Sequence, residues 1–148
     1  MRLKQLLADG RLRPHRPSRR EMQERLSVVD RNLRDAKVDG ISDDLKHQTA
    51  YGAAFVLATM VLSASGHRTV GEGHHWVTFE VLPDLLGETL RELAEYFDQA
   101  RSQRNRSQYD SVGDISGADA GELLIEARKF RSIVLAWLKK HRASLAPR

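Results

Sequence analysis

The chain has 148 residues, of which 41% are hydrophobic and 30% are charged, a composition typical of a single globular domain. It contains no cysteine, which excludes disulfides and thiolate metal sites. Its longest apolar stretch, YGAAFVLATMVLSA, is too short to cross a bilayer, and no apolar signal segment follows the basic N-terminus. We therefore expect a cytoplasmic protein that does not insert into a membrane.

Positive charge is concentrated at the two ends of the chain. Residues 1–20 carry seven Arg or Lys against one Asp, and residues 139–148 add four Arg or Lys and no acidic residue. Residues 21–138 carry a net charge of −6. Basic ends of this kind either bind phosphate backbones or anionic partners, or are simply solvated tails.

The chain divides into a basic arm, residues 1–17, and a helical domain, residues 18–148. A short helix is expected in the arm around its leucines, Leu3, Leu6 and Leu7. Ser18 and Glu21 have the spacing of a capping box, in which each side chain satisfies a free backbone amide, so a long helix begins here. Apolar residues then recur at steps of three and four, which predicts an amphipathic helix. These residues are Met22, Leu26, Val29, Leu33 and Ala36.

A second helix begins at Ser42, which can cap the first turn, while Asp43 and Asp44 face the positive end of the helix dipole. From Tyr51 to Leu62 its residues are apolar or small on nearly every face. This pattern predicts the central and most buried helix of the fold.

Three further segments predict helices. HHWVTFEVLPDLLG predicts a short helix bent at Pro83, ETLRELAEYFDQARSQRNR a longer one, and Ser116 begins a last helix that runs past Trp137. No segment alternates convincingly between polar and apolar residues. We therefore predict an all-α fold, an antiparallel four-helix bundle with a short extra N-terminal helix.

The end of the third long helix, RSQRNRSQYD, is the candidate anion-binding site. Arg104 extends the apolar stripe of this helix by one step. Its planar guanidinium can donate two parallel hydrogen bonds to a phosphate and stays charged at any working pH. Arg101 and Arg106 add positive charge nearby, so the three arginines are candidate RNA- or phosphate-binding residues.

Asn105 and Tyr109 add polar groups to the same stretch, an amide and a phenolic hydroxyl. The alternative is structural: Arg104 pairs with an acid such as Asp98 or Asp110, and Tyr109 closes the end of the bundle.

The helix layout, with RNRSQYD at the end of the third long helix and a further helix after a short loop, resembles a HEPN domain (higher eukaryote and prokaryote nucleotide-binding). The resemblance covers the chain roughly from Ser18 to His141, and GEGHHWVTFEVLP and AEYFDQARSQRNRSQYD are similar to a bacterial branch of that family. The family's motif is an arginine, a polar residue that is often asparagine, a few residues and a histidine. Arg104 and Asn105 match its first positions, and Tyr109 stands at the position of the histidine.

This resemblance implies a homodimer in which the motif residues of both subunits meet in a cleft. Many members are metal-independent endoribonucleases, in which the ribose 2′-OH attacks the adjacent phosphodiester and a cyclic phosphate is left. Arg104 would stabilise the charge that develops on the phosphate, with Asn105 and Tyr109 completing the catalytic set. A free tyrosine has a pKa near ~10 and is a poor base compared with histidine, so the tyrosine weakens the expectation of cleavage.

Two features bear on which residue could act as the base. Five residues along a regular helix correspond to a rotation of about 140°, so Arg104 and Tyr109 share a face only if the helix unwinds near Ser107 or if they come from different subunits. His74 and His75 are further candidate bases, or they simply begin the short helix. No recognised metal-ligand spacing is present, and we expect neither a metal nor a cofactor.

Two functional hypotheses follow. The first is an endoribonuclease toxin of a bacterial toxin–antitoxin or defence module. The resemblance implies it, because several HEPN proteins are toxins encoded beside a small nucleotidyltransferase that neutralises them. In some of these pairs the nucleotidyltransferase adds adenylate to a tyrosine near the motif. The second is a non-catalytic helical dimer that binds RNA or a nucleotide, or docks a nucleotidyltransferase partner.

Overall fold

The computed structural model describes residues 2–71, 74–109 and 115–148, with the side chains of residues 105–109 left out. Helices dominate this part of the chain, and the predicted all-α class is confirmed. The long helices are α2 (Arg19–Asp35), α3 (Asp43–Ala64), α6 (Arg91–Tyr109) and α7 (Gly117–His141). The shorter elements are α1 (Arg2–Ala8), β1 (Leu12–Pro14), β2 (His67–Thr69), α4 (His75–Glu80), α5 (Leu82–Leu86) and the 3₁₀ turn η1 (Glu88–Leu90).

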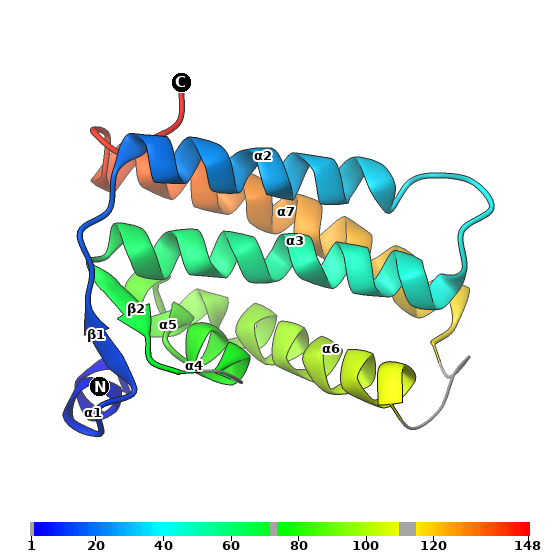
Figure 1. Ribbon diagram of the computed structural model, residues 1–148, viewed down its shortest axis with the longest axis horizontal. Helices are drawn as coiled ribbons and strands as arrows, with labels where there is room; N and C mark the ends of the chain where they lie inside the picture. The colour runs from blue at the N-terminus through cyan, green and yellow to red at the C-terminus, as the bar shows by residue number, and fades with distance from the viewer. Residues whose placement is uncertain (1, 72–73, 110–114) are drawn as a thin grey trace.

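The long helices lie side by side along the longest axis of the molecule (Figure 1). In this view α2 and α6 run in one direction, and α3 and α7 run in the other (Figure 1). Helix α3 contacts α2, α6 and α7, and the short helices α4 and α5 also pack against it. The central position predicted for this helix is confirmed, whereas the assignment to a HEPN-type bundle stays a prediction.

Local capping explains where three of the long helices begin. The hydroxyls of Ser18, Ser42 and Ser116 each accept a hydrogen bond from the backbone N–H three residues later. Each cap satisfies an amide that has no partner inside its helix, which contributes on the order of 1 kcal/mol. The Glu21 carboxylate, however, binds His15, Arg25 and Ser63, so the first cap uses the serine half of the expected capping box.

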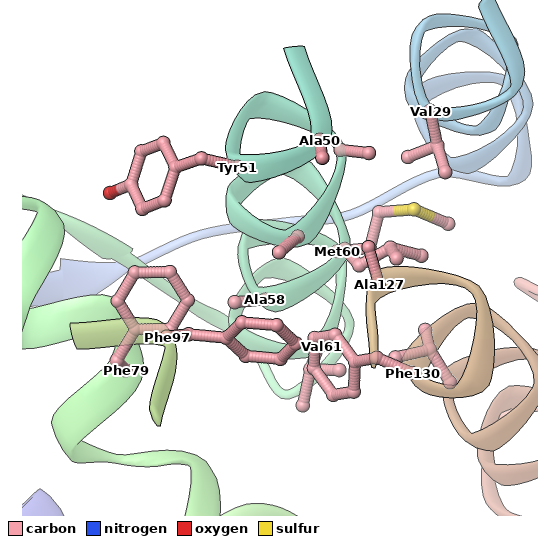
Figure 2. Close-up of a cluster of buried hydrophobic side chains, with 14 of the residues drawn as sticks. Val29, Ala50, Tyr51, Ala58, Met60, Val61, Phe79, Phe97, Ala127 and Phe130 are labelled. Carbon is pink, nitrogen blue, oxygen red and sulfur yellow. The ribbon is translucent and has the colours of Figure 1, made fainter. Parts of the chain in front are cut away.

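The core is built around α3, because its small residues let neighbouring helices approach closely. Ala50, Ala53, Ala54 and Ala58 are fully buried. Aromatic rings fill the space beside α3 (Figure 2): the centroid of Phe97 lies 5.9 Å from that of Phe79 and 5.2 Å from that of Phe130. Rings at these separations add to the stability supplied by burial alone. Tyr51 lies at the edge of this group with its hydroxyl pointing away from α3 (Figure 2).

A short antiparallel ribbon, not predicted from the sequence, joins the N-terminal arm to the segment after α3. Strand β1 pairs with β2 so that Leu12 faces Thr69, Arg13 faces Arg68 and Pro14 faces His67. Three-residue strands are too short to show a period-two pattern, which is why the sequence did not predict them.

The N-terminal arm packs on the body of the protein. Leu6 and Leu12 are buried together with Leu62 of α3 and with Val77 and Val81 at α4. The predicted short helix is present as α1. The basic residues of the arm are therefore displayed on a folded surface rather than on a free tail.

Helix α6 matters most for the site. It continues as an α-helix to Tyr109 without unwinding at Ser107, so Arg104 and Tyr109 of one chain are separated by a rotation of about 140° around its axis. The predicted bend at Pro83 is also observed: α4 ends at Glu80 and α5 begins at Leu82, with the proline in its first turn. Among the described helices, none is both long enough and apolar enough to cross a bilayer.

Candidate functional site

Arg104 lies against α3, over the ring of a tyrosine. Its guanidinium carbon is 5.6 Å from the ring centroid of Tyr51, a cation–π contact that stabilises a charged group above an aromatic face. One turn earlier in α6, Arg101 Nε donates a hydrogen bond of 2.8 Å to Asp98 Oδ1. Both arginine side chains are half-buried, so their charge acts on neighbours through a partly desolvated environment.

His75, the first residue of α4, contacts the same tyrosine. Its Nδ1 lies 2.8 Å from Tyr51 Oη, and its ring stacks on Phe55 with centroids 3.8 Å apart and planes inclined by 17°. Tyr51 and Phe55 are four residues apart in α3, so they share a face and together fix the orientation of the imidazole. The structure thus brings together Arg104 and one of the predicted candidate bases.

The surroundings keep both members of the Tyr51–His75 hydrogen bond uncharged. Burial lowers the pKa of His75, and the positive charges of Arg104 and Arg101 lower that pKa further. Burial also raises the pKa of Tyr51 well above its usual value, although the two arginines oppose this shift. When Tyr51 Oη accepts the hydrogen bond from Nδ1–H, His75 Nε2 carries the free lone pair and can accept a proton.

A third side chain of α3, His47, continues this face toward the end of α6. It is 1% exposed, and its Nε2–H donates to Gln103 Oε1 at 3.3 Å. Burial lowers the pKa of His47, and the nearby Arg104 adds to this effect, while Gln103, Asp119 and Asp44 oppose it. The group stays neutral, and within the described part of the chain its Nδ1 has no hydrogen-bond partner.

Four residues of this site were not predicted from the sequence: His47, Tyr51, Phe55 and Gln103. A signal was present, because the first three are spaced at i, i+4 and i+8 and so lie along one face of α3. The strong apolar character of this helix concealed them, since an aromatic residue in such a stretch predicts core packing.

The other predicted site residues have different outcomes. His74 precedes α4, and its side chain lies against Gly71. A Cβ placed on Gly71 would be only 2.9 Å from His74 Nε2. Of the two histidines, His75 is the one that forms a hydrogen bond with Tyr51. The side chains of Asn105, Arg106 and Tyr109 lie outside the described residues.

No group of three or more His, Asp or Glu side chains gathers in a metal-binding arrangement in residues 2–71, 74–109 and 115–148. Comparison of the chain with protein-family models, with curated proteins and with solved structures found no match.

Proposed function

We propose that this protein is a HEPN-like, metal-independent endoribonuclease that acts as the toxin of a bacterial toxin–antitoxin or defence module. The observation that carries the proposal is the arrangement of Arg104 and His75 around Tyr51. A permanently charged guanidinium and a neutral imidazole flank the same ring, at 5.6 Å from its centroid and 2.8 Å from its hydroxyl oxygen, respectively. A cation for the phosphate and a neutral proton acceptor are the two groups that metal-independent RNA cleavage needs.

In the proposed reaction Arg104 binds the non-bridging oxygens of a phosphodiester and stabilises the negative charge of the transition state. His75 Nε2 takes the proton of the ribose 2′-OH, whose oxygen then attacks the phosphorus. The bond between phosphorus and the 5′-oxygen breaks, and this oxygen takes a proton from water. The products are a 2′,3′-cyclic phosphate and a free 5′-hydroxyl.

In this proposal His75 supplies the proton-accepting function for which the tyrosine of the motif is poorly suited. We expect a cytoplasmic homodimer, as the resemblance to HEPN proteins implies. Because Tyr109 and Arg104 of one chain lie on different faces of α6, Tyr109 would contribute to the site that contains the Arg104 of the partner subunit. A small nucleotidyltransferase is the antitoxin that we expect beside it.

The contacts that hold His75 in place favour a second, non-catalytic function. Its Nδ1 is engaged by Tyr51 and one ring face is covered by Phe55, and histidines fixed in this way often serve packing rather than proton transfer. On that interpretation the protein is a non-catalytic dimer that binds RNA or a nucleotide through Arg101 and Arg104, or that docks a nucleotidyltransferase.

Induced expression in bacteria, followed by an assay of the purified protein on RNA, separates the two functions. For a nuclease we expect growth arrest and products that end in 2′,3′-cyclic phosphate, and the Arg104→Ala variant should lose both. Arg91→Ala is the matched control, because Arg91 lies at the start of the same helix and pairs with Glu88 on the surface. RNA that binds and stays intact would support the non-catalytic dimer, and RNA that neither binds nor breaks would contradict both functions.

A further inference from the structure

A cavity with a mixed lining lies beside Phe55, between α3, Arg25 of α2 and strand β2. Its volume is about 220 Å³, and Phe55, Val56 and Leu62 form its apolar wall. The polar part of the lining combines basic and hydroxyl side chains. These are His15, Arg25, Thr59, Ser63, His67 and Arg68, with Thr69 and Thr78 beside them. A space of this size and lining suits an anionic group with a small organic body.

Two basic side chains of this cavity have polar atoms without a partner in the described part of the chain. Within the described residues, the Arg68 guanidinium makes no ion pair or hydrogen bond, and the buried His67 Nδ1 has no hydrogen-bond partner. Arg68 also lies directly opposite Arg13 in the ribbon, where two like charges oppose each other. Arg68 is exposed, and an anion bound there would offset this repulsion.

The carboxylate next to the cavity does not neutralise Arg68. Glu21 accepts hydrogen bonds from Ser63 at 2.5 Å and from Arg25 at 3.0 Å, and its Oε1 lies 2.7 Å from His15 Nε2. These contacts hold one wall of the cavity in place. Arg25 binds Glu21 through Nε, so its terminal Nη groups are not used by this ion pair.

The cavity and the Arg104–His75 site lie along the same face of α3 and share the side chain of Phe55. Tyr51, Phe55 and Thr59 follow one another at steps of four residues, and Phe55 takes part in both sites: it stacks on His75 and lines the cavity. Eight residues of helix separate Tyr51 from Thr59, which corresponds to about 12 Å. A ligand that reaches both sites must therefore be extended and carry more than one anionic group.

We propose that this cavity is a second phosphate-binding subsite, in which Arg68, Arg25 and His67 hold a phosphate of the RNA strand that flanks the phosphodiester at Arg104. The inference rests on the proposed function, because it requires an RNA strand at Arg104. It adds a substrate class: single-stranded RNA of several nucleotides rather than a mononucleotide. In such a strand the Phe55 side chain separates the reacting phosphate from the flanking one.

Binding of non-cleavable 2′-O-methyl RNA, measured by calorimetry, tests this proposal. The probes are a hexanucleotide, a dinucleoside monophosphate and inorganic phosphate. The dinucleotide has one phosphate and can fill only one subsite. Arg68→Gln is compared with Arg13→Gln, a matched control that removes the facing exposed arginine, which is not part of the cavity lining. Neither substitution touches the core, so both variants should fold.

We expect Arg68→Gln to weaken hexanucleotide binding by roughly tenfold, the loss of one charge-assisted contact. It should also reduce the slope of log K against log salt concentration by about 0.7, the value for one phosphate on a single strand. Binding of the dinucleotide should stay unchanged within about twofold, and Arg13→Gln should weaken the hexanucleotide by less than about threefold.

Each other outcome overturns the subsite in a distinct way. If Arg68→Gln and Arg13→Gln behave alike while Arg104→Gln weakens both RNA probes, the proposed function stands and the second subsite is wrong. If Arg68→Gln affects only inorganic phosphate, the cavity is a site for free phosphate and not for RNA. If the wild-type protein binds neither RNA probe, the proposed function and the subsite are both contradicted.

Discussion

His15 and His75 are both half-buried beside α3, but their partners are of opposite character. His15 lies 2.7 Å from a carboxylate oxygen of Glu21, near the C-terminal end of the helix. His75 bonds to the neutral hydroxyl of Tyr51 and lies within the field of Arg104 and Arg101. The two guanidiniums favour the neutral imidazole at His75. The same residue type thus binds a carboxylate in one place and a neutral hydroxyl near two arginines in the other.

The two regions also differ in the charge that surrounds their titratable groups. Burial raises the pKa of Glu21, but hydrogen bonds from Ser63, His15 and Arg25 outweigh this effect, and the pKa is lowered overall. These hydrogen bonds converge on one carboxylate and hold the N-terminal arm, α2 and α3 together. Around His75 the arginines bring positive charge close to a neutral base, an arrangement more typical of a functional site.

The largest effect that this comparison predicts is on catalysis. His75→Asn keeps a hydrogen-bonding side chain but removes the proton acceptor, and we expect RNA cleavage to fall by about 10²- to 10⁴-fold. The rate of appearance of 2′,3′-cyclic phosphate measures this loss. His141→Asn, at an exposed position near the end of α7, is the control and should cleave at the wild-type rate. Equal rates for all three proteins would show that His75 takes no part in the reaction.

The next effect is on stability and concerns Glu21. Glu21→Gln removes the charge that His15, Arg25 and Ser63 surround, and we expect the free energy of unfolding to fall by about 2 kcal/mol. Urea denaturation followed by circular dichroism measures it. Glu24→Gln breaks an exposed pair with Arg20 on the same helix and should cost less than about 0.5 kcal/mol. Similar losses in the two variants would argue against a structural role for the Glu21 network.

The smallest effect is the pH dependence of stability, which should fall into two windows. The pKa of His75 is lowered in the folded protein, so the unfolded chain takes up protons first and stability is lost as the pH falls below about 6.5. The pKa of Glu21 is also lowered, so its contribution is present above the usual value of 4.5 and is lost as the pH falls through the lower folded value.

Urea midpoints measured from pH 7.5 to 3 test this prediction. His75→Asn should reduce the loss in the upper window, where His47 also contributes because its pKa is lowered, and Glu21→Gln should reduce the loss in the lower window. A wild-type profile that is flat between pH 7 and 5 would contradict the neutral state assigned to these histidines.

The sequence by itself determined where the helices begin and which one lies at the centre. The caps at Ser18, Ser42 and Ser116 are hydrogen bonds between groups three residues apart, and the uniform apolar character of α3 reflects burial on every side. Signals of this kind are local or periodic, so they can be detected in a single chain. Arg104 was identified in the same way, as the next step of an apolar stripe.

The tertiary structure alone decided which polar groups meet. Tyr51 and His75 are 24 residues apart and Leu12 and Thr69 are 57 apart, and no local pattern specifies either pair. Their positions follow from how α4 and the N-terminal arm pack against α3, which is set by the shape and burial of the whole core. Sequence patterns report the faces of single elements, whereas a site made from three elements exists only once those elements have been packed together.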